Sequence, residues 1–155
     1  LNVGRRVFSM KLKVFNIELD GIDKCGKDSV KPYVFYLEPG KYLCRARGLI
    51  SQIAYAKLYK RNIEWDGADY AKNTLFVLLE VDKQDWEIRC KLTNEPNTGF
   101  TYEEMTQAFK LALYELKERF DVPENHILVF NTSEYTPYAI ADEIKTHLEY
   151  LNNQN

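Results

Sequence analysis

The residues of this chain best suited to chemistry lie between Gly21 and Lys27, in the stretch GIDKCGK. Glycines at both ends of this stretch allow backbone conformations that a Cβ atom would forbid, so successive N–H groups can point at one anion. Lys27 follows Gly26 directly, and a lysine at that place reaches the outer phosphates of a nucleotide. A helix that starts there adds the positive end of its dipole. The spacing predicts a phosphate-binding loop, with an ordinary glycine-containing turn as the alternative.

Two neighbouring residues are candidates for binding magnesium. Asp28 stands where a phosphate-binding loop of this spacing normally has the hydroxyl of Ser or Thr, and Ser29 comes one residue later. A carboxylate is also a hard oxygen ligand for Mg²⁺, although it brings negative charge close to the phosphates. The sequence does not rank Asp28 and Ser29.

The segments around the loop predict how it is positioned. The run Thr74 to Val81 is apolar on both faces, as expected for the central strand of a parallel sheet. Thr101 and Glu104 form a capping box ahead of a long amphipathic helix. Pro32 should weaken or bend the helix that follows the loop. The expected strands are 11–19, 42–46, 74–81 and 126–130, and the expected helices are 27–37, 49–59, 83–92, 101–120 and 137–151.

Strands that alternate with helices predict an α/β fold. We expect a P-loop NTPase-like three-layer sandwich, with a mainly parallel sheet of about four strands and helices on both faces. Met10 is a candidate start, so residues 1–9 are treated as an N-terminal extension or expression remnant, and residues 10–155 as one domain. The mixed segment 63–73 is expected to be a loop or short helical turn, and the polar segment 93–99 to be mobile.

The composition narrows the classes of function. With 155 residues and 45% apolar content, the chain can bury one core. The 21 basic and 23 acidic residues leave no field that would hold a nucleic acid, and no apolar run is long enough for a membrane span. Three cysteines without metal-binding spacing favour a reduced, cytoplasmic protein, and two histidines argue against a histidine-based triad. Cys25 lies inside the loop, where its small size matters more than its thiol.

Two stretches in the first third of the chain resemble thymidylate kinases, which are P-loop nucleoside-monophosphate kinases. The residues DGID at 20–23, followed by GK at 26–27, resemble the family's E-G-I-D-x-x-G-K-S-T. Ala46 and Arg47, with Ser51, Ala54 and Tyr55 after them, resemble D-R-x-x-x-S-x-x-A-Y-Q.

Two later stretches continue the resemblance in the same order. The residues LEVD at 79–82, with Arg89 seven residues on, resemble L-D-V-D-P and the arginine that opens the family's lid. The residues FNTS at 130–133 resemble the I-D-A-S that ends the last strand. The resemblance covers nearly everything from Val14 to Leu151, and it implies the kinase fold.

The resemblance also implies a reaction: transfer of phosphate from ATP, with Mg²⁺, to dTMP or another deoxynucleoside monophosphate. Such a reaction needs positioning and charge stabilisation rather than an activated nucleophile. The implied catalytic residues are Lys27, Arg47 and Arg89, the last in a lid at about 89–99. The implied ATP and magnesium contacts are Gly21, Asp23, Cys25, Gly26, Lys27, Asp28, Ser29, Asn131 and Thr132.

Asp23, Ser51 and Tyr55 are the implied contacts to the acceptor nucleotide. Strand alternation puts Arg45 on the same side as Arg47, which suggests that Arg45 holds the acceptor phosphate. The alternatives are a turn residue for Asp23, core packing for Tyr55 and surface ion pairs for the arginines.

The chain also departs from the family. Ala46 replaces an aspartate that lies beside the reacting phosphates, and Ala56 replaces a glutamine. Only about nineteen positions separate Lys27 from Ala46, so the segments that carry most of the family's acceptor-base pocket are largely missing. These departures support an alternative, a weak or inactive nucleotide-binding module with a regulatory role. The short chain resembles phage-encoded members, which implies the host cytoplasm, and the dimers common in the family make a homodimer a further expectation.

Overall fold

The computed structural model describes residues 13–37, 40–63, 71–93 and 99–154. Its strands are β1 (Asn16–Asp20), β2 (Leu43–Ala46), β3 (Thr74–Glu80) and β4 (Ile127–Asn131). Its helices are α2 (Lys27–Leu37), α3 (Leu49–Leu58), α5 (Lys83–Thr93), α6 (Tyr102–Glu118) and α7 (Pro137–Asn153), with the 3₁₀ turn η1 (Glu124–His126) before β4.

The four described strands form one parallel sheet in the order β2-β1-β3-β4. Parallel neighbours need a crossover connection, and the helices between the strands supply it. β3 lies between β1 and β4, so the prediction of a central, doubly buried strand at 74–81 is confirmed.

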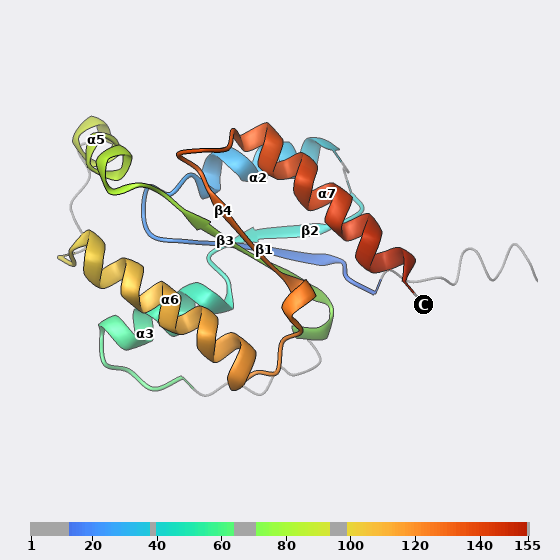
Figure 1. The fold of residues 1–155 in the computed structure, drawn as a ribbon, viewed down its shortest axis with the longest axis horizontal. Coiled ribbons are helices and arrows are strands. Elements are labelled where there is room, and N and C mark those ends of the chain that lie inside the picture. The colour runs from blue at the N-terminus through green and yellow to red at the C-terminus, as the bar shows by residue number, and fades with distance from the viewer. Residues whose placement is uncertain (1–12, 38–39, 64–70, 94–98, 155) are drawn as a thin grey trace, which may run out of the picture.

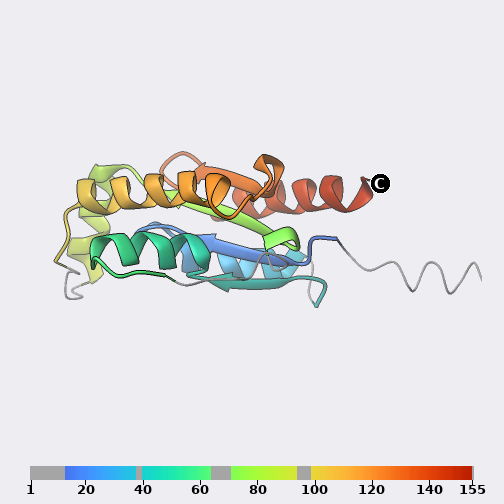
Figure 2. The same cartoon turned by 90° about the horizontal axis from the view of Figure 1, so that it is seen from below.

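Helices cover both faces of the sheet. α2 packs against α7 on one face, and α3 packs against α6 on the other (Figure 1). The view from below shows α6 above α3 and α7 above α2, in the same two pairs (Figure 2). The predicted three-layer α/β architecture is therefore confirmed.

The core forms where the apolar helix faces meet the sheet. Every side chain of β1 is buried, and so are the first six of β3. The buried positions of α6 and α7 recur every three or four residues, as the amphipathic pattern predicts, and they are Met105, Ala108, Phe109, Ala112, Leu116, Ile140, Ala141, Ile144, Leu148 and Leu151.

The element boundaries differ from the expected ones by a few residues. β1 begins at Asn16, although the strand was predicted from residue 11, and residues 11 and 12 lie outside the described part. β4 begins at Ile127 because η1 takes the residues just before it. The predicted turn at 63–73 and the predicted mobile segment at 93–99 fall largely on residues 64–70 and 94–98, which also lie outside. Among the described residues, no helix is long and apolar enough to cross a membrane.

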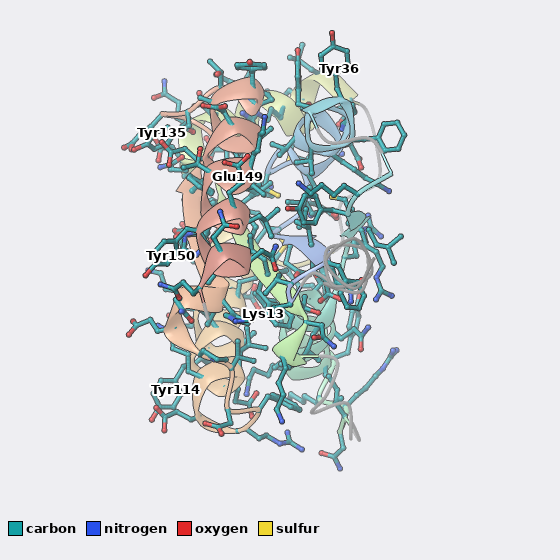
Figure 3. All side chains as sticks on the ribbon, turned by 90° about the vertical axis from the view of Figure 1, so that its right-hand side faces the viewer. Lys13, Tyr36, Tyr114, Tyr135, Glu149 and Tyr150 are labelled. Atoms are coloured by element: carbon teal, nitrogen blue, oxygen red, sulfur yellow. The ribbon has the colours of Figure 1, made fainter. Side chains whose placement is uncertain are left out.

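The C-terminal helix is tied to the start of the sheet. The side-chain amide of Asn152 donates to Val14 O at 3.0 Å and accepts from Val14 N at 2.8 Å. Lys13 Nζ donates to the carbonyl of Gln154 just beyond the helix. On the α7 side, Tyr135 and Tyr150 point outward from the molecule (Figure 3).

The predicted capping box is present, and it gives a test of helix stability. Thr101 Oγ1 accepts from Glu104 N at 3.1 Å, and Glu104 Oε1 accepts from Thr101 N at 3.1 Å. We expect Thr101→Ala to lower the free energy of unfolding by about 1 kcal/mol, because an N–H at the helix start loses its acceptor. Urea unfolding measures this. Thr146→Ala, on the exposed side of α7, is the matched control and should change stability by less than about 0.5 kcal/mol; an equal loss in both variants contradicts the prediction.

Candidate phosphate-binding site

The order of the strands creates a crevice at one edge of the sheet. From β1 the chain crosses to β2 on one side, and it then returns past β1 to β3 on the other. Ligands in open α/β sheets bind outside the carboxyl ends of the strands at such a reversal. The loop Gly21 to Gly26 leaves β1 there, Arg47 follows β2, and Thr132 follows β4.

The two glycines of the loop are needed for different reasons. A Cβ atom on Gly21 would lie 2.3 Å from Leu79 O and 2.5 Å from Cys25 Sγ, so only glycine fits against β3. Gly26 has φ +105°, in the region that L residues rarely adopt. Cys25 is fully buried, and burial raises the pKa of its thiol. Its side chain fills the inside of the loop, in line with the predicted role of its size.

Lys27 lies at the first position of α2 with its ammonium group turned to the loop. Lys27 Nζ donates to Gly21 O at 2.6 Å and to Ile22 O at 3.1 Å, and it lies 3.5 Å from Cys25 Sγ. The side chain is buried, yet it lines an open cavity. A buried cation whose described partners are neutral gains free energy when an anion reaches it.

The loop surrounds a cavity of about 610 Å³, which we call the loop cavity. Four basic and two acidic residues are among those that line it, so its formal charge favours anions. Its lining residues are Asp23, Lys24, Cys25, Gly26, Lys27, Asp28, Ser29, Val30, Arg47, Arg89, Thr93, Thr132 and Pro137. Nine of these were predicted from the sequence as site residues.

Helix α5 holds the outer edge of the loop. Trp86 Nε1 donates to Asp23 O at 3.0 Å, and Arg89 Nη1 donates to Lys24 O at 2.8 Å. From the other side, Thr132 Oγ1 donates to Cys25 O at 2.6 Å. Arg89 therefore belongs to a helix that contacts the loop, while the rest of the lid predicted at 89–99 falls mainly on residues outside the described part.

Arg47 approaches the cavity from the turn after β2. Its guanidinium is largely exposed and lies 3.6 Å from Asp23 Oδ1. The pKa of Tyr55 is raised to about 12, chiefly by burial and also by the charge of Asp23, while the charge of Arg47 opposes the rise. Tyr55 itself lines a neighbouring hollow of about 360 Å³ together with Gln52 and Tyr59. It is thus near the loop cavity without being part of its lining.

Asp28 and Ser29 are exposed at the start of α2 and line the cavity. No group of three or more His, Cys, Asp or Glu side chains suited to a metal ion occurs among the described residues. Magnesium at nucleotide sites is held by one or two protein oxygens together with phosphates and waters, so a carboxylate and a hydroxyl at this place fit it. Either could hold Mg²⁺ brought in by a nucleotide.

Besides Gly21 and Tyr55, three further predicted residues do not line the loop cavity. Arg45 Nη2 lies 3.7 Å from Glu18 Oε2, its partner across the strands. The strand alternation on which its predicted alignment with Arg47 rested ends before Arg47, which follows the last strand residue with φ +67°. Ser51 is buried and donates to Asp20 Oδ1 at 2.5 Å. Asn131 Nδ2 donates to Asp82 Oδ1 at 2.8 Å, which ties β4 to the end of β3.

Sequence reasoning assigned no role to two buried acids on β1, although Asp20 belonged to one of the matched stretches. Glu18 and Asp20 both accept hydrogen bonds from the start of α3. The pKa of Glu18 is raised from 4.5 to about 7, chiefly by burial and also by the charge of Asp20, while the hydrogen bond from Leu49 N and the charge of Arg45 oppose the rise. Burial also raises the pKa of Asp20. The one signal available in the sequence was that Glu18 and Asp20 alternate with apolar residues in this strand.

The raised pKa of Glu18 predicts a pH dependence of stability. The folded protein binds this proton more tightly than the unfolded chain does, so the added stability is complete below about pH 4.5 and is lost as the pH rises through about 7. Glutamine does not titrate, so the Glu18→Gln variant lacks this loss. When the pH rises from 5 to 8, the free energy of unfolding of the wild type should therefore fall by about 1–3 kcal/mol relative to that of Glu18→Gln. Urea unfolding at both pH values measures this, and identical pH profiles for the two proteins would contradict it.

Neither a scan of protein-family models nor a search of curated protein sequences gives a match to this chain. The class that the fold defines is therefore a parallel α/β protein with a cationic cavity at the carboxyl ends of its strands.

Proposed function

We propose that this protein is a nucleotide kinase that transfers phosphate from ATP to a deoxynucleoside monophosphate with the help of Mg²⁺. The observation that carries the proposal is the loop cavity, where Lys27, Arg47 and Arg89 converge from three different connections of the sheet. Its volume of about 610 Å³ suits phosphate groups with part of a nucleotide. The likeness of the four sequence stretches to thymidylate kinases adds the class of acceptor.

The reaction moves one phosphoryl group between two phosphates. The bond between the γ-phosphorus of ATP and the β–γ bridging oxygen breaks and leaves ADP, while an oxygen of the acceptor phosphate bonds to the same phosphorus. Charge spreads over the three equatorial oxygens of the moving group, so cations placed around them lower the barrier. Magnesium, when bound with the nucleotide, neutralises part of the charge on the phosphates.

Each basic residue has a distinct task in this proposal. Lys27 exchanges its bonds to Gly21 O and Ile22 O for the outer phosphates of ATP. Arg47 leaves Asp23 to meet the acceptor phosphate, and Asp23 is then free to meet a sugar hydroxyl. Arg89, held on the loop by Lys24 O, adds positive charge from α5.

A second candidate function is that of a nucleotide-binding module that binds ATP but does not catalyse phosphate transfer. Ala46 is the last residue of β2 and stands where the family has an aspartate, so this position supplies no carboxylate. Such a protein would bind ATP in the same cavity and act through its bound state.

A coupled assay separates the two candidates. Purified protein is incubated with ATP, Mg²⁺ and each of the four common deoxynucleoside monophosphates, and ADP release is followed. The kinase proposal predicts ADP release that depends on one of the four acceptors. Binding of ATP without acceptor-dependent release would contradict the kinase and favour the second candidate.

A further inference from the structure

The first turn of α3 is held by carboxylates from another element. Asp20 Oδ1 accepts from Gly48 N at 2.7 Å, from Ser51 N at 3.1 Å and from Ser51 Oγ at 2.5 Å. Glu18 Oε1 accepts from Leu49 N at 2.8 Å. The first N–H groups of a helix have no partner within it, and the N-cap residue Gly48 has no side chain to supply one. Strand β1 therefore caps this helix from outside.

Arg47 lies directly before the capped turn and is held from both sides. Its own N–H donates to Leu19 O at 3.0 Å, and the next N–H, that of Gly48, donates to Asp20. Arg47 has φ +67°, a left-handed conformation that a residue other than glycine keeps only when its surroundings hold it. The bonds to β1 thus fix the turn from which the guanidinium extends toward the loop cavity.

The fit between the turn and β1 is close. A Cβ atom on Gly48 would lie 2.0 Å from Glu18 Oε1, so the backbone of the turn packs directly against the Glu18 carboxylate. Asp20 is fully buried, and its second oxygen, Oδ2, has no hydrogen-bond partner among the described residues. The residue after Asp20 is Gly21, the first of the phosphate-binding loop. One carboxylate therefore lies between the loop and the turn that carries Arg47.

We propose that Asp20 is a positioning residue that keeps Arg47 in place to meet phosphate in the loop cavity. Asp20 acts through the backbone of Gly48 and Ser51 and does not itself touch the substrate. The inference rests on the proposed function in one respect, namely that Arg47 contacts a phosphate.

A double-mutant cycle tests whether Asp20 acts through Arg47. The variants are Arg47→Ala, Asp20→Asn and the combination, and kcat/KM for the acceptor nucleotide is measured for each. Each single change should lower kcat/KM by about tenfold or more, and the double variant should fall no more than about twofold below Arg47→Ala, because the two residues serve one contact. Losses that multiply, or an Asp20→Asn variant as active as wild type, would overturn the inference.

Two further variants guard against a loss of folding. Ser51→Ala removes only the 2.5 Å bond to Asp20 and should lower kcat/KM less than Asp20→Asn, again without an added loss in the Arg47→Ala background. If Asp20→Asn does not fold, Ser51→Ala takes its place in the cycle. The inference then stands if Ser51→Ala lowers kcat/KM alone but adds no loss to Arg47→Ala, and it is overturned otherwise. Asp142→Asn, on the exposed side of α7, is the matched control and should leave kcat/KM unchanged.

The same cycle separates this inference from the kinase proposal. If wild-type protein turns over none of the four acceptors, the kinase proposal fails, and the cycle is repeated on the dissociation constant of inorganic tripolyphosphate measured by calorimetry. Weaker binding in Arg47→Ala with no further weakening in the double variant supports the role of Asp20. Independent losses, or no effect of Arg47→Ala on binding, overturn it.

Discussion

Replacing Lys27 by methionine should abolish most of the proposed phosphate transfer. Among the residues that the structure describes, Lys27 is the one lysine that is buried and also lines the loop cavity. A preorganised group can stabilise the charge that develops in the transition state. Removing one such group lowers kcat by about 10²–10³-fold. Methionine keeps the length and apolar stem of the side chain but removes the charge. We therefore expect Lys27→Met to lower kcat by at least about 100-fold in the coupled assay.

A matched control distinguishes the position of Lys27 from the overall charge of the cavity. Lys24→Met removes the same formal charge from the same lining, but Lys24 is more exposed and lies at the outer edge of the loop. We expect it to lower kcat by less than about tenfold, as for a more solvated charge. Equal losses in the two variants would mean that general attraction, rather than a specific contact, accounts for the activity.

Replacing Gly21 by alanine should produce the largest loss of stability. The added Cβ would meet Leu79 O at 2.3 Å and Cys25 Sγ at 2.5 Å, and the carbonyl belongs to the central strand. A backbone atom in a buried sheet cannot move aside, so the loop itself must shift. Overpacking of this kind costs about 1–3 kcal/mol or somewhat more, which we expect to appear as a clear fall in the urea midpoint.

Gly99→Ala is the control for this prediction. Gly99 has φ +87° but nothing within 4 Å of an added Cβ, so the change tests backbone strain without close contact. We expect it to cost about 1 kcal/mol. If Gly21→Ala were no more destabilising than Gly99→Ala, the close approach of the loop to β3 would not limit stability.

The sequence predicted those features that depend on neighbouring residues in the chain. The apolar run at 74–81 predicted a buried strand, and Thr101 with Glu104 predicted the start of α6. The limits of α2 at Lys27 and Leu37 agree with the predicted range 27–37, although Pro32 lies inside the helix. Local patterns were sufficient in these cases because the physical cause is local.

The features that were missed depend on contacts between distant parts of the chain. Asp20 and Ser51 are thirty-one residues apart, and their bond follows from the pairing of β1 with β2, which no local pattern reveals. The same holds for Trp86, whose indole N–H reaches Asp23 O. Arg45 was assigned to the cavity because strand alternation was carried past the end of β2. The left-handed turn at Arg47 could not be anticipated, since that conformation is rare outside glycine.

Whether the loop receives phosphates can be measured at the loop itself. In a ¹H–¹⁵N NMR titration of the labelled protein with ATP and Mg²⁺, we expect the largest saturable shifts at the amides of residues 23–29, and we expect these shifts to disappear in Lys27→Met. No saturable shifts in the wild-type protein, or shifts confined to amides far from the loop cavity, would contradict the claim that this loop holds the phosphates.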